Sequence, residues 1–161
     1  MPVYLFTFHA YRSWMPHHPR GYTRRGEGYK EPDPDMAENY ARRANADESV
    51  FDHAVQRALI EQTIESCPYI NARLHGSGSD ASHLHLLVSW SQDRDWLSVR
   101  KSLKAALTKR LNQTDTGVAL SRGGSRKRVR NDGHFQYLMK TYLPGHRGVG
   151  WYEDRGWVEP R

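Results

Sequence analysis

The stretch Ser82-His83-Leu84-His85-Leu86-Leu87-Val88-Ser89-Trp90 gives the strongest indication of the fold. It is short, apolar and partly β-branched, which is typical of a β-strand. Side chains alternate between the two faces of a strand, so His83 and His85 should point the same way. The opposite face would enter a core with three apolar side chains, Leu84, Leu86 and Val88. Two imidazoles side by side on a rigid strand make half of a divalent-metal site, and a pair without a ligand is the alternative.

The length and charge of the chain limit the class of protein. Its 161 residues suit one domain over residues 1–161, large enough for a hydrophobic core. The net charge of +6 favours an anionic partner, nucleic acid first and an acidic membrane surface second. Cys67 is the only cysteine, which excludes an internal disulfide and fits a reducing compartment. We find neither a signal peptide nor an apolar run of ~20 residues, and therefore expect a cytoplasmic, nucleoid-associated protein without a membrane partner.

The periodicity of the remaining chain predicts an antiparallel-rich α+β fold. Strands are expected at residues 3–11, 69–75, 82–90 and 118–120, with a turn at 76–80. Amphipathic helices are expected at residues 50–67, 96–113 and 134–143. The resulting order, β-α-β-β-α-β-α, is typical of a ferredoxin-like fold, an antiparallel sheet with helices on one face.

A long polar stretch, about residues 12–48, interrupts this pattern. Its prolines and glycines predict a loop, with a short helix at residues 36–44. Cations alternate with tyrosines in this stretch: Arg20, Tyr22, Arg24, Arg25, Tyr29 and Lys30. Such a segment could bind single-stranded nucleic acid by phosphate pairing and base stacking, or it could be a solvated loop.

A second cationic region follows the central strands. From Arg100 to Arg130 there are ten lysines and arginines and one acid, Asp115. Glycines at positions 123 and 124 would let the backbone approach a phosphate, which arginine side chains can pair bidentately. The predicted DNA-binding residues are Arg100, Lys104, Arg122, Arg126, Lys127, Arg128 and Arg130.

The histidine strand, the basic region and a late helix with a tyrosine together resemble the single-tyrosine HUH transposases, of the insertion-sequence and REP-associated tyrosine transposase kind. The matching residues are 82–88 and His134-Phe135-Gln136-Tyr137-Leu138, and the element order agrees from about residue 3 to residue 143. The resemblance implies a ferredoxin-like catalytic domain that cleaves and rejoins single-stranded, hairpin-forming DNA through a 5′-phosphotyrosine intermediate. It also implies Mg²⁺ or Mn²⁺ as cofactor, and either a monomer or a homodimer.

By this resemblance, the tyrosine is the nucleophile and the two histidines are metal ligands: Tyr137, His83 and His85. A phenol with a pKa of about 10 is mostly neutral at pH 7, so a nearby cation must favour its attack on phosphorus. Tyr142 is the rival nucleophile. In an α-helix, at about 100° per residue, Tyr142 would face partly away from Tyr137.

The third metal ligand is left open. The family places a polar ligand one helical turn after the tyrosine, which is Thr141 here, and Gln136 beside the tyrosine is a second candidate. A non-catalytic nucleic-acid-binding protein on the same fold is the alternative function. A metal hydrolase of another class is disfavoured, because zinc hydrolases built on His-x-His add an Asp and a further His soon after, where this chain has Leu86-Leu87-Val88.

Overall fold

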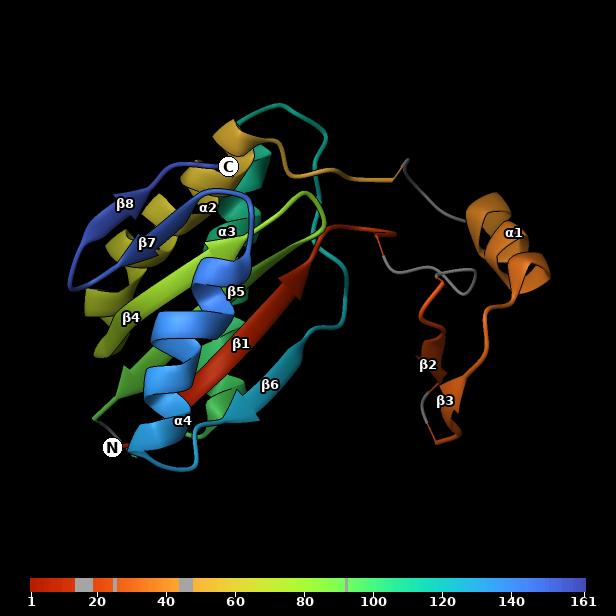
Figure 1. The fold of residues 1–161 in the computed structure, drawn as a ribbon. Helices are drawn as coiled ribbons and strands as arrows, with labels where there is room; N and C mark the ends of the chain where they lie inside the picture. Colours follow the sequence, from red (N-terminus) through yellow and green to blue (C-terminus); the bar gives the residue numbers. More distant parts are fainter. Residues whose placement is uncertain (14–18, 25, 44–47, 92) are drawn as a thin grey trace.

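A six-stranded antiparallel sheet forms the centre of the computed structural model, which describes residues 1–161 except 14–18, 25, 44–47 and 92 (Figure 1). The strand order is β6-β1-β5-β4-β7-β8, and every neighbouring pair is antiparallel. The strands are β1 (Val3–His9), β4 (Ala72–Ser79), β5 (His83–Trp90), β6 (Ser125–Arg128), β7 (Gly150–Tyr152) and β8 (Gly156–Val158). The expected antiparallel α+β class is therefore confirmed, with the histidine strand β5 inside the sheet.

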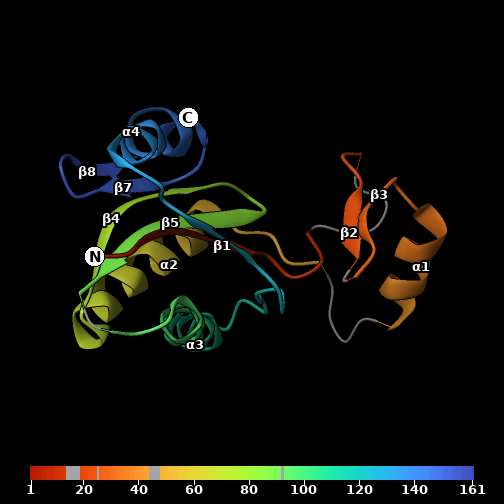
Figure 2. The ribbon, with the colours of Figure 1, turned by 90° about the horizontal axis from the view of Figure 1, so that it is seen from below.

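Two long helices, α2 (His53–Ser66) and α3 (Trp96–Gln113), cover one face of the sheet (Figure 2). Asp52 and Asp95 begin them by accepting hydrogen bonds from backbone N–H groups three residues on. A 3₁₀ turn, η1 (Cys67–Ile70), follows α2. The helices and the sheet enclose the main core, which includes Phe6, Phe8, Leu59, Leu84, Leu86, Trp90 and Leu103. No helix in the described part of the chain has the length and apolar character to cross a membrane.

The other face of the sheet carries the last helical segment (Figure 2). It consists of α4 (Asp132–Tyr137), a π-helical turn η2 (Leu138–Tyr142) and a 3₁₀ turn η3 (Leu143–Gly145). A second core joins this segment to the sheet, formed by Leu5, Leu87, Leu138, Met139, Leu143 and Tyr152. The expectation of helices on one face thus holds for α2 and α3, whereas the tyrosine-bearing segment packs on the opposite face. The sheet can accept both because its central strands present apolar residues on either side.

Residues 76–79 of the turn predicted at residues 76–80 are instead part of β4, which pairs with β5 with a register shift between Leu74 and Gly76. Glycines suggested a turn from the sequence, but here Gly78 allows two segments to approach closely. A Cβ atom on Gly78 would lie 2.7 Å from the carbonyl oxygen of Leu143. This glycine therefore permits the docking of the η2–η3 segment on β4.

The polar stretch at residues 12–48 contains elements of its own. The strands β2 (Tyr22–Arg24) and β3 (Gly28–Lys30) form a separate hairpin, and α1 (Pro34–Arg43) follows. In both views these three elements lie beside the sheet and not on its faces (Figures 1 and 2). The short helix expected here is confirmed, although it begins two residues earlier, and Ala44 lies outside the described residues.

Two of the cations of this stretch form ion pairs within it. Arg24 and Lys30 each form an ion pair with Glu27, at 3.4 and 3.0 Å. Arg25, another of the predicted cations, lies outside the described residues. Binding of single-stranded nucleic acid by this stretch therefore stays a prediction.

Candidate metal and tyrosine site

The two histidines of β5 lie on the face of the sheet that carries α4. Their alternation with buried apolar residues is confirmed, because Leu84, Leu86 and Val88 have no exposed surface. On the neighbouring strand β1, His9 pairs with His83 and Thr7 pairs with His85. Paired residues share a face, so the pleat of β1 and β5 places these four polar side chains on one face of the sheet.

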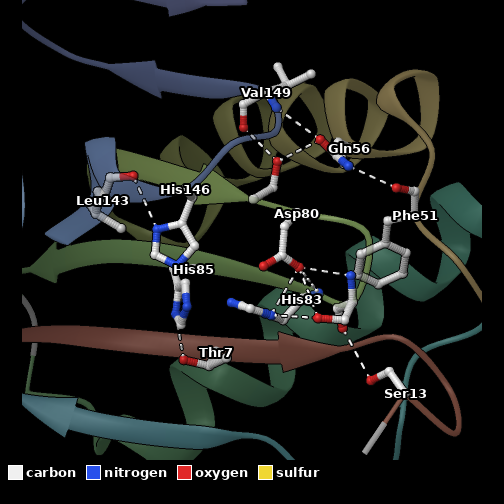
Figure 3. Close-up of polar contacts among 12 residues, drawn as sticks. Thr7, Ser13, Phe51, Gln56, Asp80, His83, His85, Leu143, His146 and Val149 are labelled. Carbon is white, nitrogen blue, oxygen red and sulfur yellow. Dashed lines mark hydrogen bonds and ion pairs between the residues drawn. The ribbon is translucent and has the colours of Figure 1, made fainter. Parts of the chain in front are cut away.

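A third imidazole joins the pair from the other end of the chain. His146 follows η3, and the possible ligand atoms of His83, His85 and His146 all lie within 4.8 Å of one another. The three rings lie close together in Figure 3, although they come from β5 and from the chain beyond η3. Three imidazole nitrogens that leave further positions open are a common ligand set for a catalytic metal ion.

Each ring is held through its Nδ1 atom. His83 Nδ1 lies 2.8 Å from the Ser82 hydroxyl in a hydrogen bond and 3.0 Å from an Asp80 carboxylate oxygen. The Nδ1–H of His146 donates to the carbonyl oxygen of Leu143 at 3.1 Å (Figure 3). His85 Nδ1 lies 2.8 Å from Thr7 Oγ1 in a hydrogen bond. The Nε2 atom of each ring is therefore the one available to a metal. Such outer hydrogen bonds fix both the tautomer and the orientation of ligand histidines.

Burial keeps two rings of the cluster, His85 and His146, in the neutral form that binds metal. Burial, assisted by the neighbouring imidazoles, lowers the pKa of His85 to about 3. Burial also lowers the pKa of His146. Burial alone would raise the pKa of Asp80, but hydrogen bonds from His83 and Ser82 lower it far below its usual range. A neutral imidazole supported by a carboxylate is the arrangement found around bound divalent metals.

Both candidate tyrosines lie near this cluster, but at different distances from it. The Tyr142 hydroxyl is 3.4 Å from His85 Nε2, and its ring packs edge-on against His146 at 5.2 Å between centroids. Tyr137 is 52% exposed and reaches the cluster through Tyr142, with 6.4 Å between the two ring centroids.

The expectation that the two tyrosines face partly away from each other is wrong, because the segment between them is not α-helical. The N–H of Leu143 donates to the carbonyl of Leu138, an i→i+5 hydrogen bond. In a π-helical turn, residues five apart lie on one face, which brings Tyr137 and Tyr142 together. π-helical turns are rare and often occur at functional sites.

An open cavity of about 260 Å³ lies in front of the cluster. Its lining combines imidazoles, a phenol, hydroxyls and two cations: Leu5, Thr7, His9, Arg20, His83, His85, Ser125, Lys127 and Tyr142. Burial and the nearby His83 lower the pKa of His9. The lining is suited to an anionic group, since its described residues include no acid.

The sequence prediction of a third ligand missed His146. Thr141 is exposed, Gln136 is half-buried, and neither residue is among those that line the cavity. A signal was present: the polar ligand expected one turn after the nucleophile falls on His146 when Tyr142, and not Tyr137, is taken as the tyrosine. Thr141, Gln136 and Tyr137 stay predictions, and the geometry favours other residues for their roles.

The predicted DNA-binding residues divide into several groups. Lys104 Nζ donates to the carbonyl oxygens of Ser121 and Arg122, both at 2.6 Å, and so ties α3 to the chain at residues 121–122. Arg100 lies 5.9 Å from the centre of the Phe8 ring, with part of its guanidinium buried. Exposed cations remain on β6 and around it: Arg122, Arg126, Lys127, Arg128 and Arg130.

Comparisons with known proteins give distant structural likenesses. No protein-family model matches the chain, and no curated protein matches it significantly. One similar structure is a REP-associated tyrosine transposase bound to a REP hairpin, with a TM-score of 0.42 and 9% identity over 84% of this chain. This chain spans 61% of that protein. Another is a candidate transposase from Deinococcus radiodurans R1, with a TM-score of 0.46 and 12% identity over 89% of this chain and 90% of that one.

Proposed function

We propose that this protein is a DNA transposase that cleaves and rejoins single-stranded DNA through a tyrosine and a divalent metal ion. One observation carries the proposal: the hydroxyl of Tyr142 lies 3.4 Å from a nitrogen of a three-histidine cluster, at an open and partly cationic cavity. A phenol beside possible metal ligands fits nucleophilic attack on a phosphodiester better than simple nucleic-acid binding.

We assign the nucleophile to Tyr142 and keep Tyr137 as its competitor. The half-exposed Tyr137 ring lies 6.4 Å from the Tyr142 ring, whereas Tyr142 itself contacts His85 and His146. Burial raises the pKa of Tyr142, so its phenol is protonated at neutral pH, while the charge of Arg20 acts in the opposite direction. The phenol therefore needs positive charge at the cavity before it can attack.

His83, His85 and His146 would hold the metal through their Nε2 atoms. When bound, a divalent cation would supply positive charge that polarises the scissile phosphate. The Tyr142 oxygen attacks phosphorus, the new P–O bond replaces the bond to the 3′ oxygen, and the phenolic proton is transferred to that oxygen overall. The protein is then linked to the 5′ phosphate and the other end is a free 3′-hydroxyl. A second 3′-hydroxyl can reverse the step without ATP, because the bond energy is retained.

The identity of the metal and of the DNA are also parts of the proposal. Three nitrogen donors favour a borderline transition metal over Mg²⁺, although Mg²⁺ or Mn²⁺ is what the sequence resemblance implies. A hairpin-forming single strand as substrate, and a homodimer as the active form, stay predictions.

A covalent-adduct assay tests the proposal. Labelled single-stranded oligonucleotides from the flanking DNA of the gene would be incubated with the protein and Mg²⁺, Mn²⁺ or Zn²⁺. The products would be separated under denaturing conditions. We expect a protein–DNA adduct that Tyr142→Phe abolishes and Tyr137→Phe retains, and that also disappears in the His83→Ala, His85→Ala double variant.

The other outcomes separate the alternatives. Loss of the adduct in Tyr137→Phe alone would keep the reaction and move the nucleophile to Tyr137. Tight DNA binding without any adduct, over oligonucleotides that tile both flanks, would favour the non-catalytic binding protein instead.

A further inference from the structure

Two cations, Arg20 and Lys127, are among the residues that line the cavity in front of the histidines. We propose that Lys127 and Arg20 form a phosphate-binding pair that holds the scissile phosphate against Tyr142 from the side opposite His146. This inference deepens the proposed function and assigns catalytic roles to two residues, one of them from outside the sheet.

Lys127 reaches the cavity because of the pleat of the edge strand β6. In the register with β1, Lys127 pairs with Leu5 and Ser125 pairs with Thr7, and all four residues line the cavity. Arg126, between them, points to the other face, where its guanidinium lies 3.8 Å from the centre of the Trp96 ring. By the same alternation Arg128 faces away from the cavity. Of the basic residues of β6, Lys127 is therefore the one that points into the cavity.

Arg20 reaches the same cavity from the chain that precedes β2. Its charge acts on the Tyr142 phenol and opposes the effect of burial on the pKa of that group. The two cations thus come from different segments and meet at the cavity that Tyr142 lines. A guanidinium can pair two oxygens of one phosphate, and an ammonium provides a compact charge beside it.

The charge balance of the lining supports an anionic ligand. Two cations line the cavity, and no aspartate or glutamate is among its described lining residues. Asp80, the carboxylate beside the cluster, already accepts hydrogen bonds from the backbone N–H groups of His83 and Ser82 and from the Ser82 hydroxyl. In phosphoryl transfer, negative charge lies on the non-bridging oxygens, and a preorganised cation next to them lowers the barrier.

The first experiment compares two variants that each lose one lysine charge, Lys127→Gln in the cavity and Lys109→Gln on the exposed surface of α3. Single-turnover adduct formation would be measured at saturating DNA, with the affinity for DNA measured separately. We expect Lys127→Gln to slow cleavage about 100-fold, Lys127→Arg to restore part of the rate, and Lys109→Gln to stay within about threefold of wild type. Arg20→Gln should resemble Lys127→Gln, with Arg42→Gln on α1 as its control, since Arg42 does not line the cavity.

The second experiment uses inorganic phosphate as the probe and does not depend on tyrosine chemistry. Phosphate binding to the metal-free protein in a chelator would be followed by NMR shifts. Lys127→Gln and Arg20→Gln should weaken this binding at least about tenfold, while Lys109→Gln leaves it unchanged. Loss of phosphate binding in those variants supports the pair even if wild type forms no adduct, an outcome that would reject the proposed function alone. The pair is rejected if Lys127→Gln and Lys109→Gln match each other in phosphate binding, whatever the cleavage assay gives.

Discussion

Replacing Gly78 with alanine tests how the third histidine is positioned. The new Cβ atom would lie 2.7 Å from the carbonyl oxygen of Leu143 and 3.2 Å from His146 Nδ1. Ordinary contact begins at 3.4 Å, so the Leu143 carbonyl must retreat by about 0.7 Å. That carbonyl accepts the Nδ1–H of His146, and the ring must therefore move or lose its hydrogen bond.

This displacement is large on the scale of a metal site. Metal–ligand distances hold within about 0.2 Å, and loss of an outer hydrogen-bond partner weakens metal affinity about 10–100-fold. We expect Gly78→Ala to weaken Zn²⁺ binding by that factor. Forcing a methyl group into a packed contact should also lower the free energy of unfolding by about 1–3 kcal/mol.

Isothermal titration with Zn²⁺ and urea unfolding of the metal-free protein would measure the two effects. Gly145→Ala is the matched control, because it lies next to His146, nothing approaches its Cβ position within 4 Å, and its φ is not positive. Wild-type zinc affinity in Gly78→Ala, with unchanged stability, would refute the argument that this close approach positions His146.

Three further predictions concern the cluster itself. Asp80→Asn removes the charge that holds the Nδ1–H of His83 and should weaken zinc binding about 10–100-fold in calorimetry; an unchanged affinity would mean that Ser82, 2.8 Å from the same nitrogen, suffices. Because the pKa of His85 is lowered to about 3, the folded chain binds fewer protons than the unfolded chain between that pH and the ordinary value of 6.5. The metal-free protein should therefore lose up to about 1.4 kcal/mol of stability per pH unit below pH 6.5 and be level above it, and a Tm that rises on acidification would contradict this. Competition titrations should show Zn²⁺ or Co²⁺ bound more than about 100-fold more tightly than Mg²⁺, since the described cluster has three nitrogen donors; equal affinities would argue against it.

Sequence periodicity predicted the structure correctly where a single helix or strand determines it. The helix expected at residues 96–113 has those bounds in the structure, because Asp95 caps it and an apolar stripe faces the core. The alternation along β5 is set by the pleat alone, so the shared face of His83 and His85 was predictable. The polar stretch at residues 12–48 was harder, because its short strands and helix carry weak local signals.

The rest of the site depends on contacts between segments far apart in the chain. His146 meets His85 only after the η2–η3 segment docks on β4, and no local pattern describes that docking. The glycines of β4 wrongly suggested a turn for the same reason. The small size of Gly78 is needed for a contact with Leu143, which lies 65 residues further on. The preference for Tyr137 rested on the family resemblance. The expectation that Tyr142 faces partly away from it rested on α-helical spacing, which the π-helical turn does not follow.

Leu143 connects the proposed nucleophile with the third ligand. Its side chain is buried in the second core, and its carbonyl oxygen accepts both the backbone N–H of His146, at 3.2 Å, and the Nδ1–H of the same residue, at 3.1 Å. Its own N–H closes the π-helical turn that ends with Tyr142. The phenol and the imidazole are therefore positioned by the packing of one residue, while His83 and His85 are positioned by the sheet. Undocking of this segment would remove Tyr142 and His146 together and leave a two-histidine site, so metal affinity and nucleophile placement should be lost as one unit.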